Sequence, residues 1–120
     1  MTPRTILYHG TKTARAMQIL HEGLLANPPI REWPWNSKPG CTYGAKSQRE
    51  ATMWARGGLW GYPESDPESE TILLLVVPTA RVRPDRNFDG DPETPNCEID
   101  GDVSPAAILC AWPACCEPRD

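Results

Sequence analysis

The chain has little of what would indicate a membrane, secreted or nucleic-acid-binding protein. Its 120 residues contain no apolar run as long as a membrane-spanning helix, so we expect no membrane partner. The formal net charge is -4, which does not favour a generally basic nucleic-acid binder. The first residues, MTPRTILYHG, lack the long apolar stretch and cleavage site of a signal peptide. We therefore expect a cytoplasmic protein.

Cysteine is present, but without the usual spacing of a metal site. The count of five is odd and, with no signal peptide, favours free thiols in a reducing compartment. Cys110, Cys115 and Cys116 cluster near the C-terminus. Zinc sites usually contain a CxxC pair, and this cluster has none. We therefore predict no metal and interpret these residues as buried or surface thiols.

Proline and glycine are abundant, whereas histidine is scarce. The chain has 14 prolines and 9 glycines, which predict many loops and short elements rather than a helical bundle. The length of 120 residues is typical of one domain with a modest hydrophobic core, and we expect a monomer. Only two histidines are present, and one of them, His9, follows the first apolar run beside Gly10.

The N-terminal part of the chain predicts a strand, a turn and a helix. Residues 5–8 (TILY) are typical of a short strand, and residues 9–11 are interpreted as the turn after it. Thr13 is a candidate N-cap for a helix of about ten residues. Apolar residues recur there at helical spacing, and Gly23 is suited to end the helix.

The rest of the chain predicts a second helix and several strands. Residues 41–45 are typical of a strand, and Ser47-x-x-Glu50 is a capping box for a helix over residues 48–56. The apolar run 71–77 predicts a central strand that is covered on both faces. The later elements are expected to be a charged loop at 81–95, a strand at 97–103 broken by Asp100-Gly101, a helical turn from Ser104-Pro105, and a strand at 108–112. The whole pattern predicts a single α+β domain over residues 1–120.

A loop rich in proline and tryptophan precedes the strand at 41–45. Proline limits the flexibility of residues 27–40, and Trp33 and Trp35 offer large apolar faces. Irregular loops of this length are often functional. Two interpretations stay open: the tryptophans cover the hydrophobic core, or one of them forms a lid over a ligand.

Three polar residues lie near the ends of predicted elements. His9 follows the first strand, Tyr43 lies in the strand before the capped helix, and Glu98 begins a strand after a polar loop. Taken singly, each is more typical of packing, hydrogen bonding or a solvated side chain than of catalysis. Their order and their local sequences carry more information than any one of them.

These residues lie in three blocks that resemble the ADP-ribosyltransferase fold. YHGT at residues 8–11, with the helix after it, resembles the opening of the diphtheria-toxin-like and poly(ADP-ribose) polymerase-like branch, which carries a His, a Tyr and a Glu in that order. Residues 40–55 (GCTYGAKSQREATMWA) resemble the second block of this branch. Glu98, with the Pro-x-x-Ile turn at 105–108, resembles the third. The resemblance implies an α+β fold with a split, mixed or antiparallel sheet and two early helices.

The resemblance also implies an activity, the transfer of ADP-ribose from NAD, as a substrate, to a protein or nucleic-acid acceptor, with release of nicotinamide. Glu98 is then the carboxylate that stabilises the positive charge developing on the ribose. His9 bonds a ribose hydroxyl, the Gly10 backbone bonds the nicotinamide amide, and Tyr43 stacks on the nicotinamide ring. Glu93 is the competing carboxylate, but Glu98 has the strand and the proline turn behind it.

Further NAD contacts are implied by the same resemblance. Trp54 covers the other face of the nicotinamide ring, as a second aromatic residue does in the polymerase branch, unless it only packs in the core. Thr11 and Ser47 are candidate polar contacts, and Trp35 is a candidate lid residue. The chain has the size of a minimal transferase, such as a small bacterial or phage effector or toxin.

Several alternatives share these residues or this fold. RNA 2'-phosphotransferases open with a similar YHGT block but use further Arg and His residues, whereas the other histidine here, His21, falls within the first helix. NAD hydrolysis needs the same residues with water as the acceptor, and a non-catalytic module on the same fold binds a partner instead. Asn96 lies two residues before Glu98, where the arginine-modifying branch has Glu or Gln, so arginine modification is not supported.

Overall fold

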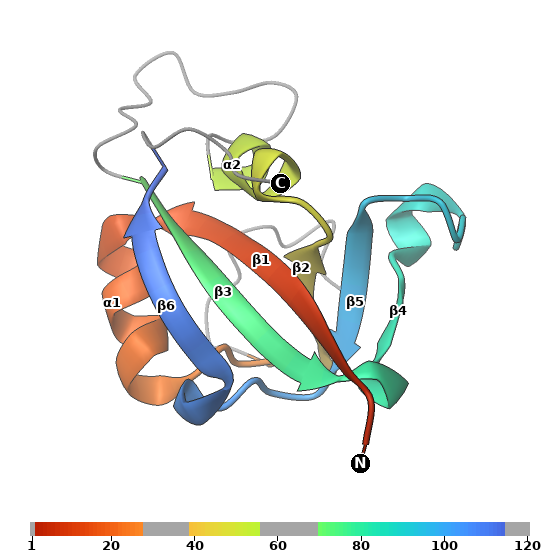
Figure 1. Ribbon diagram of the computed structural model, residues 1–120, viewed down its shortest axis with the longest axis horizontal. Helices are drawn as coiled ribbons and strands as arrows, with labels where there is room; N and C mark the ends of the chain where they lie inside the picture. The colour runs from red at the N-terminus through yellow and green to blue at the C-terminus, as the bar shows by residue number, and fades with distance from the viewer. Residues whose placement is uncertain (1, 28–38, 56–69, 115–120) are drawn as a thin grey trace.

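The chain folds around an antiparallel sheet (Figure 1). The computed structural model describes residues 2–27, 39–55 and 70–114. Within these ranges six strands lie in the order β4-β5-β2-β1-β3-β6, and every neighbouring pair is antiparallel. They are β1 (Arg4–Lys12), β2 (Cys41–Ala45), β3 (Glu70–Pro78), β4 (Val82–Pro84), β5 (Asn96–Asp100) and β6 (Ile108–Pro113). The predicted α+β class is confirmed, and the sheet is antiparallel rather than mixed.

Two helices of the described chain pack on opposite faces of the sheet. They are α1 (Thr13–Glu22) and α2 (Gln48–Ala55). Successive residues of a strand point to opposite faces. α1 shares a buried cluster with Leu7 of β1, whereas α2 lies against Gly10 on the other side of that strand. Figure 1 shows α1 behind β3 and β6, and α2 above the sheet beside the C-terminal half of β1.

The sheet divides the hydrophobic core into two clusters. The larger one lies on the α1 side and contains Leu7, Ala16, Ile19, Leu24, Leu73, Leu75, Val77, Cys97, Ile99 and Val103. The smaller one lies on the α2 side and contains Ala45, Ala51, Ala55, Ile72 and Ala114. Tyr8 and Trp112 pack against the smaller cluster, and their two rings meet each other edge to face with centroids 6.2 Å apart. Because α2 presents alanines to the sheet, it approaches the strands closely.

β1 is longer than the sequence suggested. The prediction ends the strand at Tyr8 and places residues 9–11 in a turn, but the strand continues to Lys12. β3 pairs with β1 from Arg4 to Lys12. The backbone therefore stays extended past the glycine, since β3 supplies hydrogen-bond partners along its whole length. His9 consequently lies inside a strand and not at the end of one.

The start of α1 differs from the prediction, whereas its end is as predicted. The predicted N-cap was Thr13, but the capping position is Lys12 and no side chain caps the helix. The Thr13 hydroxyl instead bonds the hydroxyl of Thr71 at 2.9 Å, because the helix leaves the strand directly beside β3. The predicted stop is confirmed at Gly23, which has a φ of +92° and donates its N–H to the carbonyl of Ile19 at 2.7 Å.

α2 has the predicted cap at Ser47. The Ser47 hydroxyl accepts a hydrogen bond from the backbone N–H of Glu50 at 3.1 Å. The Glu50 carboxylate does not return this bond, because it accepts one from the Asn96 side chain at 3.1 Å and so ties the helix to β5. The helix runs over Gln48–Ala55, and its predicted last residue, Arg56, lies outside the described residues.

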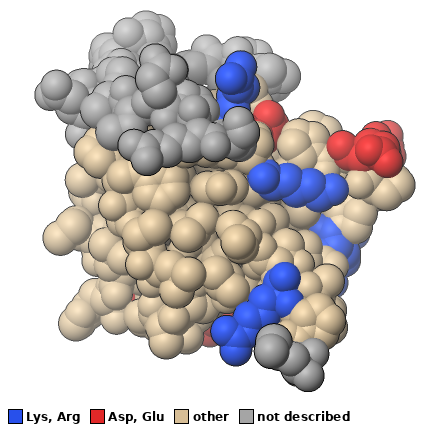
Figure 2. All heavy atoms as spheres, in the orientation of Figure 1, with Lys and Arg blue, Asp and Glu red and all other residues tan. Residues whose placement is uncertain are grey.

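The edge strand β4 has no counterpart in the sequence prediction. Residues 81–95 were expected to form a charged loop, but they contain β4 and then the 3-10 helix η4 (Arg86–Phe88). β4 has only 3 residues, all half-buried, so no apolar pattern reveals it. The predicted turn after η4 is confirmed, with Asp89 and Gly90 at positive φ. Figure 2 shows charged side chains mainly toward the β4 and β5 end of this face.

The remaining strands lie where the sequence placed them. β3 lies centrally between β1 and β6, as predicted for residues 71–77, but it is fully covered on one face only. Leu73, Leu75 and Val77 are buried on that face, whereas Leu74 and Val76 on the other face are half-buried. β5 is shorter than predicted and ends at Asp100, just before Gly101, which has a φ of +76°. The predicted turn at Pro105 is the 3-10 helix η5 (Pro105–Ala107). In the part of the chain that is described, no helix has the length and apolar character needed to cross a membrane.

Candidate functional site

The candidate site lies where β1 and β2 separate. The two strands are in register at one pair, Tyr8 opposite Ala45. Next to this pair the His9 side chain reaches from β1 to β2, and its Nδ1 lies 2.8 Å from the carbonyl oxygen of Tyr43. A carbonyl oxygen only accepts, so Nδ1 carries a proton in this contact. The bond therefore orients the imidazole and links two of the predicted residues.

Tyr43 and Glu98 lie opposite each other on β2 and β5. They are register partners, so their side chains leave the same face of the sheet. Glu93, the competing carboxylate, is exposed on a turn whose backbone N–H bonds the side chain of Asp91. Glu98 is therefore the glutamate that the fold places beside Tyr43.

His9 is joined to Tyr43 through the Tyr43 backbone. Along β1, the His9 side chain leaves the same face of the strand as Leu7. Tyr8 leaves the other face, and its partner Ala45 shares that face with Tyr43. The fold thus places the three predicted residues on three adjacent strands. A common cleft for their three side chains stays a prediction.

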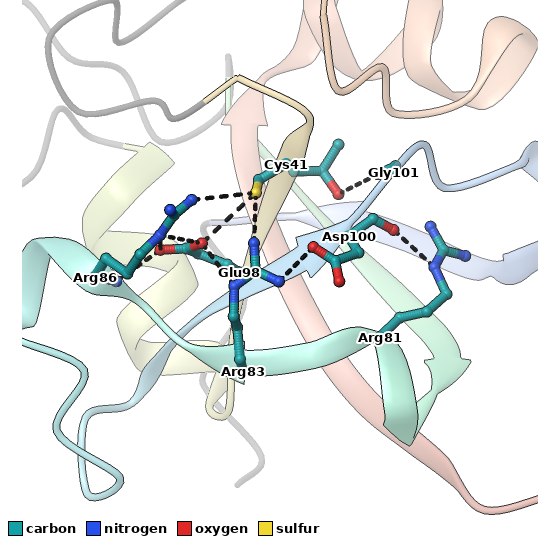
Figure 3. Close-up of polar contacts among 8 residues, drawn as sticks. Cys41, Arg81, Arg83, Arg86, Glu98, Asp100 and Gly101 are labelled. Atoms are coloured by element: carbon teal, nitrogen blue, oxygen red, sulfur yellow. Dashed lines mark hydrogen bonds and ion pairs between the residues drawn. The ribbon is translucent and has the colours of Figure 1, made fainter.

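Glu98 is the buried centre of a polar cluster (Figure 3), called here the Glu98 cluster and made of Glu98, Arg83, Arg86 and Cys41. Its side chain is 0% exposed. It accepts hydrogen bonds from Arg83 Nε at 3.0 Å and from Arg86 Nε at 2.9 Å. The backbone N–H of Arg86 donates to the second oxygen at 2.7 Å, and the Cys41 thiol lies 3.6 Å from the first. These partners offset the cost of removing a carboxylate from water.

Opposing effects act on the ionisation of the Glu98 cluster. Burial alone would raise the pKa of the Glu98 carboxyl, but hydrogen bonds from the Arg86 side chain, the Arg86 backbone and Arg83 outweigh it and lower this pKa. Burial raises the pKa of the Cys41 thiol, and the nearby Arg83 only partly opposes this rise. At neutral pH the cluster therefore holds an ionised carboxylate beside a neutral thiol.

Arg83 and Arg86 were not among the predicted site residues. For Arg83 a signal was present. Residues 81–83 (RVR) place two positive charges on either side of an apolar residue, and residues 98–100 (EID) place two negative charges in the same pattern. Such segments favour antiparallel pairing, and β4 and β5 do pair with Arg83 opposite Glu98. Arg86 had no such signal, because it reaches the carboxylate from η4 and not from a strand.

Gly10 is required by the packing of α2. A Cβ at this position would lie 1.9 Å from the Ala51 carbonyl oxygen and 3.1 Å from the Ala55 Cβ. The helix therefore fills the space that the sequence suggested was open for a ligand. One edge of the strand is occupied as well, because Gly10 pairs with Ile72 of β3. A ligand would have to approach the Gly10 backbone from the side of β2.

The structure also shows what surrounds the other predicted NAD contacts, Thr11, Ser47 and Trp54. Thr11 is 0% exposed within β1. Ser47 uses its hydroxyl to cap α2. Trp54 donates its Nε1 hydrogen to the Asn96 side chain at 2.7 Å, which anchors the indole two residues from Glu98 along β5. Asn96, noted as a departure from the arginine-modifying branch, thus connects α2 to β5.

Some predicted features lie outside the described residues. These are Trp33, Trp35, Cys115 and Cys116. Cys41 and Cys97 are buried free thiols, and Cys110 is an exposed one. In residues 2–27, 39–55 and 70–114 no group of three His, Cys, Asp or Glu side chains is placed to hold a metal ion.

The site is thus defined by its own residues and geometry. His9 lies on β1, Tyr43 on β2 and Glu98 on β5, which are neighbours in the sheet. Two arginines from the edge of the sheet surround the Glu98 carboxylate. No model of a known protein family matches this chain, and no curated protein matches its sequence.

Proposed function

We propose that this chain is an enzyme that transfers ADP-ribose from NAD to a macromolecular acceptor and releases nicotinamide. The proposal starts from the resemblance of three short sequence blocks. One structural observation supports it most strongly. Residues far apart in the sequence lie on adjacent strands, with His9 bonded to Tyr43 and Tyr43 opposite Glu98. This arrangement supports the proposal because it brings one residue from each of the three blocks onto neighbouring strands.

The proposed reaction breaks the bond between the nicotinamide nitrogen and C1 of its ribose. The bonding electrons leave with nicotinamide, which becomes neutral, and an acceptor atom that loses a proton forms the new bond to the same carbon. The transition state carries positive charge on the ribose, as in glycoside cleavage. An ionised carboxylate suits this charge, and the lowered pKa of Glu98 keeps it ionised at neutral pH.

The other residues have positioning roles in this proposal. His9 bonds a ribose hydroxyl, and Tyr43 stacks on the nicotinamide. The hydrogen bond from His9 to the Tyr43 backbone carbonyl orients the imidazole, which lowers the entropy cost of positioning the substrate. Trp54, anchored to Asn96, is the candidate for the second face of the nicotinamide ring.

Chromatographic measurement of nicotinamide release, combined with transfer of labelled ADP-ribose to separated protein, DNA and RNA, tests the proposal. We expect the wild type to release nicotinamide and to label one fraction. Glu98→Gln is expected to lower the rate by about a hundredfold or more, as for other removals of a charge-stabilising group. Glu93→Gln is the matched control and is expected to keep the wild-type rate, because Glu93 lies on an exposed turn.

Circular dichroism is needed for each variant, since Glu98 also pairs with two arginines. A folded wild type that releases no nicotinamide with any acceptor fraction or with water would overturn the proposal. Full activity in folded Glu98→Gln would remove Glu98 from its role. Nicotinamide release without transfer of the label identifies water as the acceptor.

A second function, dinucleotide binding without catalysis, is favoured by one observation. Both oxygens of Glu98 already accept hydrogen bonds from Arg83, Arg86 or Cys41. In that arrangement the carboxylate has no site for a ribose hydroxyl until a donor moves. Binding of NAD at equilibrium with no release of nicotinamide identifies this second function.

A further inference from the structure

The two arginines that contact Glu98 are held in different ways (Figure 3). Arg83 uses every nitrogen of its guanidinium: Nε donates to Glu98, Nη1 to Asp100, and Nη2 to the Cys41 sulfur at 3.0 Å. Arg86 uses Nε for Glu98 and Nη2 for a longer contact to Cys41 at 3.6 Å. Among the described residues, its Nη1 has no hydrogen-bond partner. Arg86 therefore keeps donor capacity for another acceptor.

Arg86 is also the easier of the two side chains to move. Its side chain is 52% exposed, against 38% for Arg83. It starts η4, outside the strand ladder that holds β4 to β5. Its backbone N–H donates to Glu98 at 2.7 Å whatever its side chain does. The side chain can turn away while Glu98 keeps that N–H and the Arg83 bond.

Glu98 has no position for a further donor while Arg86 is in place. Oε1 faces Arg83 Nε, Arg86 Nε and the Cys41 thiol, and Oε2 faces the backbone N–H and Nε of Arg86. A carboxylate offers about four lone-pair sites in total, and this side chain is 0% exposed. Access to Glu98 therefore requires one donor to leave, and of the two arginines Arg86 has the more exposed side chain and the fewer hydrogen-bond partners.

We propose that the Arg86 side chain is a latch on Glu98, which a diphosphate group opens by binding the arginine. Arginine binds phosphate oxygens through parallel, charge-assisted N–H donors. A diphosphate carries more negative charge than one carboxylate, so it competes for the guanidinium. Movement of Arg86 to the diphosphate uncovers one side of Glu98, and Arg83 keeps the carboxylate in position. The inference rests on the proposed function, because the diphosphate is that of NAD, but binding alone reveals it.

Calorimetric binding of inorganic pyrophosphate and of ADP to the full chain tests the latch without any reaction. The wild type is expected to bind both, and Arg86→Ala to bind both about tenfold more weakly or worse. Arg15→Ala is the charge-matched control on α1, which packs on the other face of the sheet, and is expected to bind like the wild type. Arg86→Lys is expected to be intermediate, because it keeps the charge and loses the planar fork.

Nuclear magnetic resonance of the Glu98 carboxyl carbon supplies a readout that a merely structural role would not move. The groups that face this carboxylate are Cys41 from β2, Arg83 from β4 and Arg86 from η4. Pyrophosphate is expected to raise the pKa of Glu98 in the wild type, because the carboxylate loses the Arg86 donor. In Arg86→Ala the pKa is expected to be raised already and to stay constant on adding pyrophosphate.

Three results overturn the latch: no binding of pyrophosphate by the folded wild type, equal affinity in Arg86→Ala, or a Glu98 pKa that bound pyrophosphate leaves unchanged. The outcome is separable from that of the proposed function. If the latch results are as expected and no nicotinamide is released, the transferase proposal fails and the latch stands. If nicotinamide is released and Arg86→Ala binds pyrophosphate normally, the latch fails and the transferase proposal stands.

Discussion

The two halves of the sheet are stabilised in different ways. β3 carries Leu73 and Leu75, both 0% exposed, and its half of the sheet is held mainly by buried apolar area. β5 and β4 form the other edge, where Glu98 is held by directional bonds from Arg83 and Arg86. Apolar burial tolerates small shifts, whereas ion pairs and hydrogen bonds require defined geometry. Most ion pairs of the described residues lie in the β4 and β5 half, although β3 also carries the buried Glu70, which pairs with Lys12 of β1 at 3.2 Å.

The largest expected effect is a loss of stability from a substitution in the apolar half of the sheet. Leu73→Ala is expected to lower the free energy of unfolding by about 2–5 kcal/mol, because it leaves a cavity in the larger cluster. Leu109→Ala, on the edge strand β6, is the matched control, since that side chain is 62% exposed. The control is expected to change stability by about 0.5 kcal/mol or less. Urea unfolding measures both, and equal losses would contradict the assignment of the core.

The next effect concerns the junction of the two halves. Gly10→Ala is expected to cost about 1–3 kcal/mol, because the new Cβ meets the Ala51 backbone and α2 must shift. Gly44→Ala provides the comparison, since its Cβ would lie 3.0 Å from a side-chain atom of Leu7. This distance is longer than the 1.9 Å to the Ala51 carbonyl oxygen at Gly10, so a smaller loss is expected. Thermal unfolding measures the pair, and a larger loss at Gly44 would contradict this account of Gly10.

The smallest expected effect is a change in how stability depends on pH, which involves the charged half of the sheet. The pKa of Glu98 is lowered in the fold, so its contribution to stability is complete above the pKa of an unfolded glutamate and is lost as pH falls through the folded pKa. Glu98→Gln is therefore expected to flatten the acid limb of stability against pH. The effect stays modest, because Arg83 and Arg86 are partly exposed and water screens them.

Unfolding free energies measured in urea from neutral to acidic pH test this difference. Leu73→Ala is the control, and it is expected to lower the curve by a similar amount at every pH, since no charge is involved. Parallel curves for the wild type and Glu98→Gln would show that Glu98 makes no pH-dependent contribution.

Features with a local cause could be predicted from the sequence. β3 follows from a continuous apolar run, the α2 cap from Ser47, and the end of α1 from Gly23. The extension of β1 through His9 could not be predicted, because it depends on pairing with β3 much later in the chain, as in His9 opposite Leu73. β4 was missed because its 3 residues carry almost no apolar signal.

The candidate site was predictable to a similar extent. The sequence named Tyr43 and Glu98 through their blocks, and the pairing of β2 with β5 placed them opposite each other. It did not indicate that the Glu98 carboxylate is covered by Arg86, since that contact depends on how η4 turns after β4. It also assigned Gly10 to ligand access, whereas the approach of α2 explains that glycine.

By itself the sequence determined the α+β class, the main strands, the end of α1 and the cap of α2, because these depend on neighbours a few residues away. Only the tertiary structure decided that His9 lies inside a strand and bonds the Tyr43 backbone, and that Glu98 is ionised within a pair of arginines. These properties arise from groups that folding brings together. Their pairing compensates the cost of removing charge from water, and that cost exists only once the chain has closed around them.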